Sequence, residues 1–230
     1  MARSSGAARM VLAGLGSSDG RSMEGSIEAL AGAGIAAFLL PGSLLGDPAR
    51  LASLAACARR RVEAVGLGRA LVAIGGAARP AFGQPFFSPA LAPLGLAAIV
   101  PARAGRQAAR RAGRLLGLAL AAAGVDLVLA PRLDLASDPK DPAGALDRFG
   151  EDPEAAGELG AAYVRGLEAG GVAACVGRFP GLGSVCAERA GGMALVGLPA
   201  ERLAAVEMRP FGRAIKAGAA AVLVGRVLVP

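Results

Sequence analysis

The sequence of 230 residues contains no histidine, no tryptophan and a single tyrosine, Tyr163. Without an imidazole, the chain can supply neither a histidine general base, nor a Ser-His-Asp triad, nor a histidine ligand for zinc. The scarcity of aromatic side chains also leaves few stacking platforms for sugars or nucleobases. Any chemistry must therefore come from Asp, Glu, Arg, Cys, Ser or backbone groups, and we expect no metal and no other cofactor.

Lysine is nearly absent as well, so arginine carries most of the formal charge of +7. One dense basic stretch is Arg59-Arg60-Arg61. The members of a second cluster recur at spacings of three and four residues, which places most of them along one side of a helix. This cluster consists of Arg103, Arg106, Arg110, Arg111 and Arg114. It is either a solvated helix face or a patch for an anionic partner. Because no aromatic residues interleave with it, we do not predict a nucleic-acid partner.

Cysteines and long apolar runs are also few. Cys57, Cys175 and Cys186 are odd in number, widely spaced and without a C-x-x-C pair, which is typical of free thiols in a reducing compartment. Arg or Gly interrupts every long apolar stretch, and the run Met10–Leu15 is too short for a convincing signal segment. The sequence therefore predicts a cytoplasmic protein with no membrane span and no membrane partner.

Short apolar runs alternate with longer helical patterns along the chain. The expected strands are residues 10–15, 35–40, 70–74, 125–130, 172–176 and 220–224. The expected helices are residues 23–33, 48–64, 103–123, 153–169 and 199–217. Asp47-Pro48 and Asp152-Pro153 each place an Asp at a helix N-cap and a Pro at the first helical position. This alternation predicts one α/β domain, residues 1–230, with a parallel sheet.

The residues alone leave open whether the sheet is doubly wound or closed as a barrel. The segment Gly14–Asp19, after the first expected strand, lacks the third glycine of a dinucleotide-binding fingerprint. Gly75-Gly76, after the third, matches neither that fingerprint nor a phosphate-binding loop. Local patterning therefore gives the fold class but not the closure of the sheet.

Five further stretches resemble a known family in their order and spacing. They are Ala130-Pro131-Arg132-Leu133-Asp134, Arg148-Phe149-Gly150-Glu151-Asp152-Pro153, Tyr163–Leu167, Phe179-Pro180-Gly181-Leu182-Gly183 and Arg209–Gly218. Together they resemble the N-terminal barrel domain of glycoside hydrolase family 3, especially its bacterial β-N-acetylhexosaminidases, over about Met10 to Pro230. The resemblance implies a TIM-barrel-like (β/α) fold, here incomplete with about six of eight strands. It also implies the retaining hydrolysis of terminal β-linked sugars.

A retaining mechanism needs a nucleophile and an acid/base. The resemblance implies an Asp nucleophile after the seventh strand, which would fall beyond Pro230, and a His acid/base after the fifth. The other family positions are replaced one by one. Gly177-Arg178 stands where the family has a Lys-His pair, and Leu182 stands where it has the His after Phe-Pro-Gly. Glu188-Arg189-Ala190 replaces the Asp-x-His segment. Gly75 replaces the Asp that ends the third strand, and Arg226 replaces the His after the sixth strand.

Two family positions that contact sugar are retained, Asp134 and Arg148, although the match of Arg148 assumes a one-residue deletion before Phe149. The alternative for Asp134 is a bond to loop amides. The alternative for Arg148 is an ion pair with Asp134, Glu151 or Asp152. Each residue therefore has a structural interpretation beside the sugar-binding one.

We predict a catalytically inactive, glycosidase-like protein that binds a sugar or serves as an assembly or regulatory subunit. Two unpaired sheet edges predict a homo-oligomer, or a partner protein that covers the open barrel. The alternative is an active retaining β-glycosidase or β-N-acetylhexosaminidase completed by another chain. In that case Glu188, paired with Asp134, is the one candidate acid/base in the matching loops.

Overall fold

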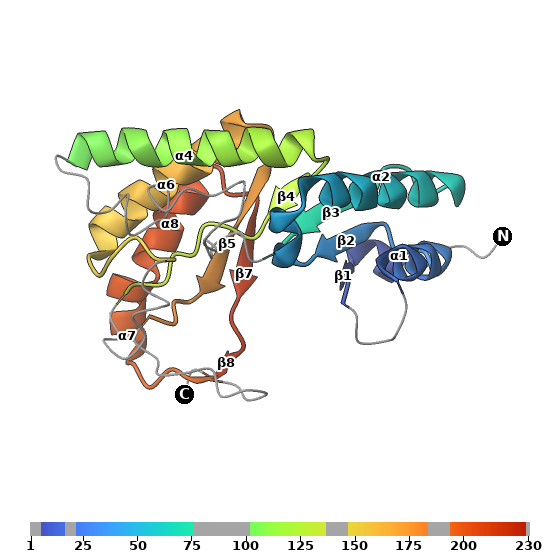
Figure 1. The fold of residues 1–230 in the computed structure, drawn as a ribbon. Helices are drawn as coiled ribbons and strands as arrows, with labels where there is room; N and C mark the ends of the chain where they lie inside the picture. Colours follow the sequence, from blue (N-terminus) through green and yellow to red (C-terminus); the bar gives the residue numbers. More distant parts are fainter. Residues whose placement is uncertain (1–5, 17–21, 76–101, 137–146, 184–193, 229–230) are drawn as a thin grey trace.

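The computed structural model describes residues 6–16, 22–75, 102–136, 147–183 and 194–228. Six parallel strands lie side by side in chain order and curl into part of a barrel (Figure 1). They are β1 (Leu12–Gly14), β2 (Ala37–Leu40), β3 (Leu71–Ile74), β4 (Leu127–Val128), β5 (Ala173–Phe179) and β7 (Ala221–Val224). The predicted α/β, TIM-barrel-like and incomplete fold is therefore confirmed, and each expected strand is present.

Helices connect the strands and pack outside the sheet (Figure 1). The longer ones are α1 (Met23–Gly32), α2 (Pro48–Ala64), α4 (Ala102–Ala122), α6 (Pro153–Ala169) and α8 (Arg209–Lys216), with short 3-10 turns η1 (Gly6–Met10) and η2 (Gly42–Gly46). Both predicted caps form: Asp47 Oδ1 accepts from Arg50 N at 2.9 Å, and Asp152 Oδ1 accepts from Ala155 N at 2.7 Å. No helix among the described residues is long and apolar enough to cross a bilayer.

The expected helix over residues 199–217 is interrupted. It consists of α7 (Ala200–Arg202), a π-helical turn η4 (Leu203–Glu207) and α8. Pro210 lies in the first turn of α8, where its missing N–H is tolerated, whereas inside a continuous helix it would break a hydrogen bond. A small parallel sheet of β6 (Ala194–Leu195) and β8 (Val227–Leu228) was not expected, because strands of two residues leave no periodic pattern.

The contact between α4 and α6 is made by backbone rather than by large side chains. A Cβ atom on Gly113 of α4 would lie 2.3 Å from Tyr163 O, and one on Gly166 of α6 would lie 2.2 Å from Arg110 O. Gly117 and Gly170 repeat this contact one helical turn further along. These glycines let the two helix backbones touch, and the apolar side chains beside them join the main core.

Tyr163 is buried in this core, edge-to-face with Phe149 at 6.1 Å between ring centroids. Burial raises the pKa of Tyr163 well above its ordinary value, because the phenolate would lose its hydration. Above a pH of about 10 the unfolded chain ionises this phenol while the native chain does not, so stability falls as pH rises. As the one tyrosine, its phenolate absorbance can be followed directly.

We expect phenolate absorbance to develop only together with alkaline unfolding followed by circular dichroism. Tyr163→Phe should resist alkali better than the wild type, since the phenol's share of the pH dependence is removed. Cys175, whose pKa burial also raises, is unchanged in that comparison. A phenol that titrates near its ordinary pKa in a folded chain would contradict the prediction.

Candidate binding site at the strand ends

The carboxyl ends of β4, β5 and β7 meet at one edge of the sheet. The segment after β4 continues beside β5, where Leu133 N donates to Gly177 O at 2.6 Å and Arg132 pairs with Gly177. Gly225 N, just after β7, donates to Phe179 O of β5 at 2.8 Å. Active sites of barrel proteins lie at this end of the strands, so the side chains gathered here form the candidate site.

Asp134 is the centre of this site, with a side chain that is fully buried. Its Oδ2 accepts from Arg132 Nη2 at 2.9 Å, from Arg132 Nε at 3.2 Å and from Arg178 Nε at 3.4 Å. Its Oδ1 accepts from the backbone N of Leu182 at 2.9 Å. Protein donors therefore occupy both oxygens of the carboxylate, including one of the loop amides considered in the sequence interpretation.

A second buried carboxylate, Asp147, lies beside the first. Arg132 Nη1 donates to Asp147 Oδ2 at 3.4 Å, so one guanidinium bridges the two acids. The neighbouring Arg148 is also buried, and its Nη1 donates to Leu135 O at 3.5 Å. The sequence interpretation singled out neither Asp147, which adjoins a matched stretch, nor Arg132, which lies within one.

Arg132 and Arg178 are the partly exposed members of this cluster. The side chain of Arg132 is 19% exposed and that of Arg178 is 25% exposed, whereas both carboxylates are buried. Arg178 lies at a register shift in the β5–β7 ladder, between Gly177 and Phe179. Such irregularities redirect a side chain at the end of a strand. Among the described side chains of this cluster, the polar groups offered to a ligand are guanidinium donors.

Three of the replaced family positions, Leu182, Gly75 and Gly177, are closely packed against apolar side chains. Leu182 is buried in a small apolar cluster with Val196 and Leu203. Gly75 follows β3, and a Cβ there would meet the Leu39 and Leu129 side chains at 3.7 Å. A Cβ on Gly177 would lie 3.1 Å from Leu223 Cβ. Arg226 follows β7 and is exposed, whereas Glu188 and Ala190 lie outside the described residues.

Glu207 is a further buried acid that sequence reasoning did not single out. It ends η4, and its Cβ would lie 3.1 Å from a Cβ on Gly181 in the Phe-Pro-Gly turn. Because residues 199–217 were expected to form one helix, nothing marked this position as buried. No group of three His, Cys, Asp or Glu side chains among the described residues could hold a metal ion.

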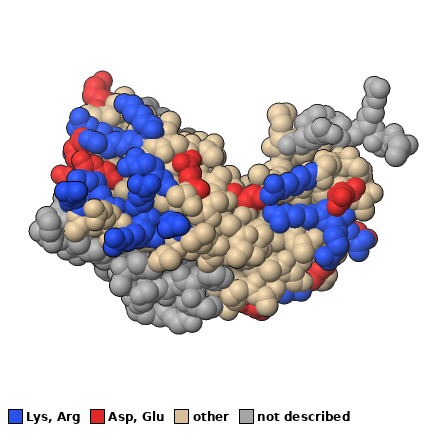
Figure 2. Space-filling model, turned by 90° about the horizontal axis from the view of Figure 1, so that it is seen from above, with Lys and Arg blue, Asp and Glu red and all other residues tan. Residues whose placement is uncertain are grey.

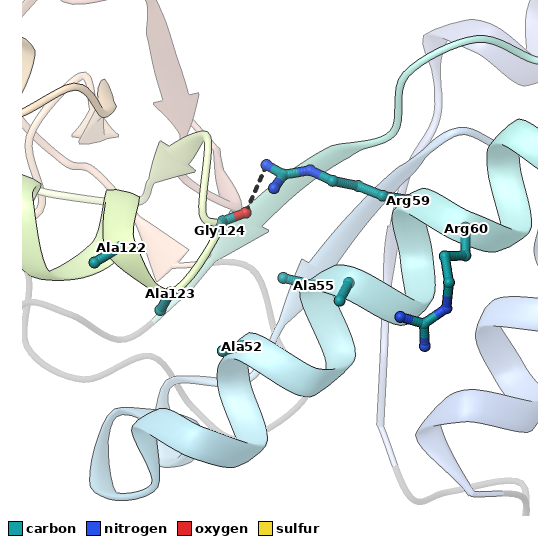
Figure 3. Close-up of a pocket in the computed structure, with 8 residues that line it drawn as sticks. Ala52, Ala55, Arg59, Arg60, Ala122, Ala123 and Gly124 are labelled. Carbon is teal, nitrogen blue, oxygen red and sulfur yellow. Dashed lines mark hydrogen bonds between the residues drawn. The ribbon is translucent and has the colours of Figure 1, made fainter.

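A separate cavity of about 380 Å³ lies between α2 and the end of α4 (Figure 3). Its lining residues are Ala52, Ala55, Ala56, Arg59, Arg60, Ala122, Ala123 and Gly124. Arg59 Nη2 points across it to Gly124 O at 2.8 Å (Figure 3). The same atom also donates to Asp126 Oδ1 at 3.1 Å. The lining offers methyl groups and two guanidiniums, which provide neither a general base nor a nucleophile.

Comparisons with known proteins agree on one family. Residues 12–230 match the model of the glycosyl hydrolase family 3 N terminal domain. The β-hexosaminidase of Thiobacillus denitrificans is 38% identical over 136 residues, 56% of this chain and 36% of that protein. The β-hexosaminidase of Stenotrophomonas maltophilia is 35% identical over 122 residues, 53% of this chain and 36% of that protein.

The solved structures point the same way. A glycoside hydrolase family 3 β-N-acetylglucosaminidase from a Paenibacillus species superposes with a TM-score of 0.82 and 26% identity, over 100% of this chain and 43% of that one. NagZ from Neisseria gonorrhoeae, in complex with N-trifluoroacetyl-D-glucosamine, gives 0.71 and 25%, over 86% of this chain and 57% of that one. The chain thus spans about a third of the curated relatives and about half of these solved chains.

Proposed function

The chain belongs to the glycosyl hydrolase family 3 N-terminal domains, and we propose that it is a catalytically inactive, β-hexosaminidase-like member that binds a sugar. The observation that carries the proposal is the packing of two positions where the resemblance implies histidines. Leu182 is buried in an apolar cluster, and Arg178 is an ion-pair partner of Asp134. A leucine has no proton to transfer, and an arginine stays protonated. Neither can therefore take over proton transfer from the acid/base, for which the resemblance implies the Asp-x-His segment, here Glu188-Arg189-Ala190.

A binding role uses the groups that remain. Arg132 and Arg178 present partly exposed N–H donors. The buried Arg148 donates to Leu135 O near the same strand ends. Hydroxyl and acetamido oxygens of a sugar are suitable acceptors for such donors. The NagZ structure in complex with N-trifluoroacetyl-D-glucosamine makes N-acetylglucosamine the first ligand to test.

The experiment that tests inactivity is hydrolysis of nitrophenyl N-acetyl-β-D-glucosaminide and of the corresponding β-glucoside. We expect no release of nitrophenol above the buffer rate, while the Thiobacillus denitrificans β-hexosaminidase, run in parallel, hydrolyses its substrate. Turnover that rises in proportion to protein concentration, and that a folded Asp134→Asn variant loses, would establish the alternative of an active β-glycosidase. A thermal-shift titration with N-acetylglucosamine separately measures binding.

An assembly role has its own supporting observation, the two edges of the main sheet. Met10 and Leu12 lie at the β1 edge and are 83% and 39% exposed, and Val224 at the β7 edge is 66% exposed. An edge strand with exposed apolar side chains readily pairs with another chain. We propose that a second copy of this chain, or a partner protein, covers these edges.

Light scattering over a dilution series is expected to give a mass at least twice that of the 22.6 kDa monomer. Val224→Lys should shift the protein toward the monomer, because a lysine at a strand edge opposes pairing. Val65→Lys, an exposed valine after α2, is the matched control and should leave the mass unchanged. A wild-type monomer at every concentration would contradict the assembly role.

A further inference from the structure

Helix α4 carries five arginines and no acidic residue in its 21 residues. Only Arg106 forms an ion pair with a described residue, Glu158, at 2.7 Å. The other four are exposed and pair with no carboxylate in the part of the chain that the structure describes. They are Arg103, Arg110, Arg111 and Arg114.

Several arginines on other helices pair with a nearby carboxylate. Arg61 of α2 pairs with Glu28 at 3.2 Å, and Arg209 of α8 pairs with Glu154 at 2.8 Å. Arg213 also pairs with Glu154. Helix α4 therefore carries more unpaired arginines than any other helix that the structure describes, and no carboxylate of the helix itself offsets their charge.

The four arginines and two leucines share the side of α4 that faces solvent. Gly113 and Gly117 face α6, and the exposed positions lie on the neighbouring, solvent-facing arc of the helix. Leu115 and Leu118 continue that arc toward the end of the helix and are 57% and 48% exposed. One solvent face of α4 is thus basic in its first turns and apolar in its last turns.

The shape of this region suits a flat partner. Helix α4 runs as an unbroken rod along one side of the molecule, and α2 lies beyond its end (Figure 1). Seen from that side, a dense basic patch covers the α4 region, a mostly uncharged region follows, and a second basic patch lies over the other end (Figure 2). A rod of 21 residues is about 30 Å long and can touch a plane along its whole length.

We propose that the solvent face of α4 docks the protein on an anionic lipid surface. Its arginines would lie at the lipid phosphates, and Leu115 and Leu118 would enter the interfacial region. Each arginine held near an anionic surface strengthens adsorption by about fivefold. The helix would lie in the plane of the interface without crossing it, which differs from the sequence-based expectation of no membrane partner. Neither the missing ion pairs nor the exposure of the leucines can be deduced from the sequence.

The test is co-sedimentation with phosphatidylcholine vesicles that do or do not contain phosphatidylglycerol. We expect binding only to the anionic vesicles, falling as sodium chloride is added. Changing Arg103, Arg110, Arg111 and Arg114 to Gln should lower the partition coefficient by about a hundredfold or more. The control changes four arginines elsewhere to Gln and so removes the same net charge; these are Arg50, Arg61, Arg209 and Arg213. It should lower binding far less.

Three results would overturn the proposal. The first is equal binding to neutral and anionic vesicles. The second is an equal loss in the α4 variant and the control, which would mean that net charge alone drives adsorption. The third is tighter binding to polyglutamate or to duplex DNA than to anionic vesicles, which would assign the face to an acidic polymer. Leu118→Ser should weaken the binding that persists at high salt, and no effect there would remove the apolar part of the proposal.

Discussion

Gly113→Ala is expected to destabilise the protein by about 3 kcal/mol, among the larger effects of adding one methyl group to a packed interior. The new Cβ would lie 2.3 Å from Tyr163 O, 3.1 Å from Tyr163 C and 3.1 Å from Leu167 N. All three atoms belong to the backbone of α6, so no side chain can rotate away to make room. Relief requires the two helices to separate, which would open the core on both sides of the contact.

Chemical denaturation measures this effect, and the chain supplies a matched control. Gly212 lies inside α8, and a Cβ there would meet nothing within 4 Å. Gly212→Ala is therefore expected to stabilise the protein by about 0.5 to 1 kcal/mol, through the lower backbone entropy of the unfolded chain. Equal midpoints for Gly113→Ala and Gly212→Ala would show that α4 and α6 are not in backbone contact.

The α4–α6 contact also shows what the sequence can and cannot reveal. Gly113 and Gly117 are four residues apart within a predicted helix, which marks a narrow face. Nothing in that spacing identifies Gly166 and Gly170 as the opposing surface, and Gly170 directly follows the helix expected over residues 153–169. The structure places the left-handed backbone at Gly171, with φ of 90°, and uses Gly170 for close packing.

The elements that could be predicted are those with local causes. Buried parallel strands are apolar on both faces, so their runs are visible without knowledge of their neighbours. The Asp47 and Asp152 caps are equally local, because each Asp bonds an amide three residues ahead. The register shift at Arg178 and the pairing of β6 with β8 depend on contacts between distant segments, and no local sequence pattern predicts them.

The candidate site divides in the same way. Asp134 and Arg148 were identified through the resemblance, and the structure brings them to the same strand ends. Asp147 was missed because its pairing with Arg132 joins residues 15 positions apart. Arg132 was not singled out, although its bonds to Asp134 span only two positions within a matched stretch. Whether Asp134 and Arg148 contact a sugar stays a prediction, since the structure contains no ligand.

Asp134→Asn is expected to cost about 3 kcal/mol of folding free energy or more, because it removes one partner of a buried ion pair. The amide keeps the shape of the carboxylate but loses its charge. Its –NH₂ would face the Arg132 and Arg178 donors or the Leu182 amide, where only an acceptor is satisfied. Chemical denaturation measures the loss, and Asp47→Asn is the control, since Asn serves equally well as an N-cap and should change little.

This variant separates the two interpretations of Asp134. If the carboxylate mainly holds the ends of β4 and β5 together, stability falls, and the double variant Asp134→Asn with Arg178→Gln costs less than the sum of the single changes. If its main task is to bind a sugar, stability stays within about 0.5 kcal/mol of the wild type and only ligand affinity drops. Four protein donors already form hydrogen bonds with its two oxygens, which favours the first outcome, a loss of stability. Because the Asp134 side chain is fully buried behind these donors, ligand recognition at this site would fall to the partly exposed Arg132 and Arg178.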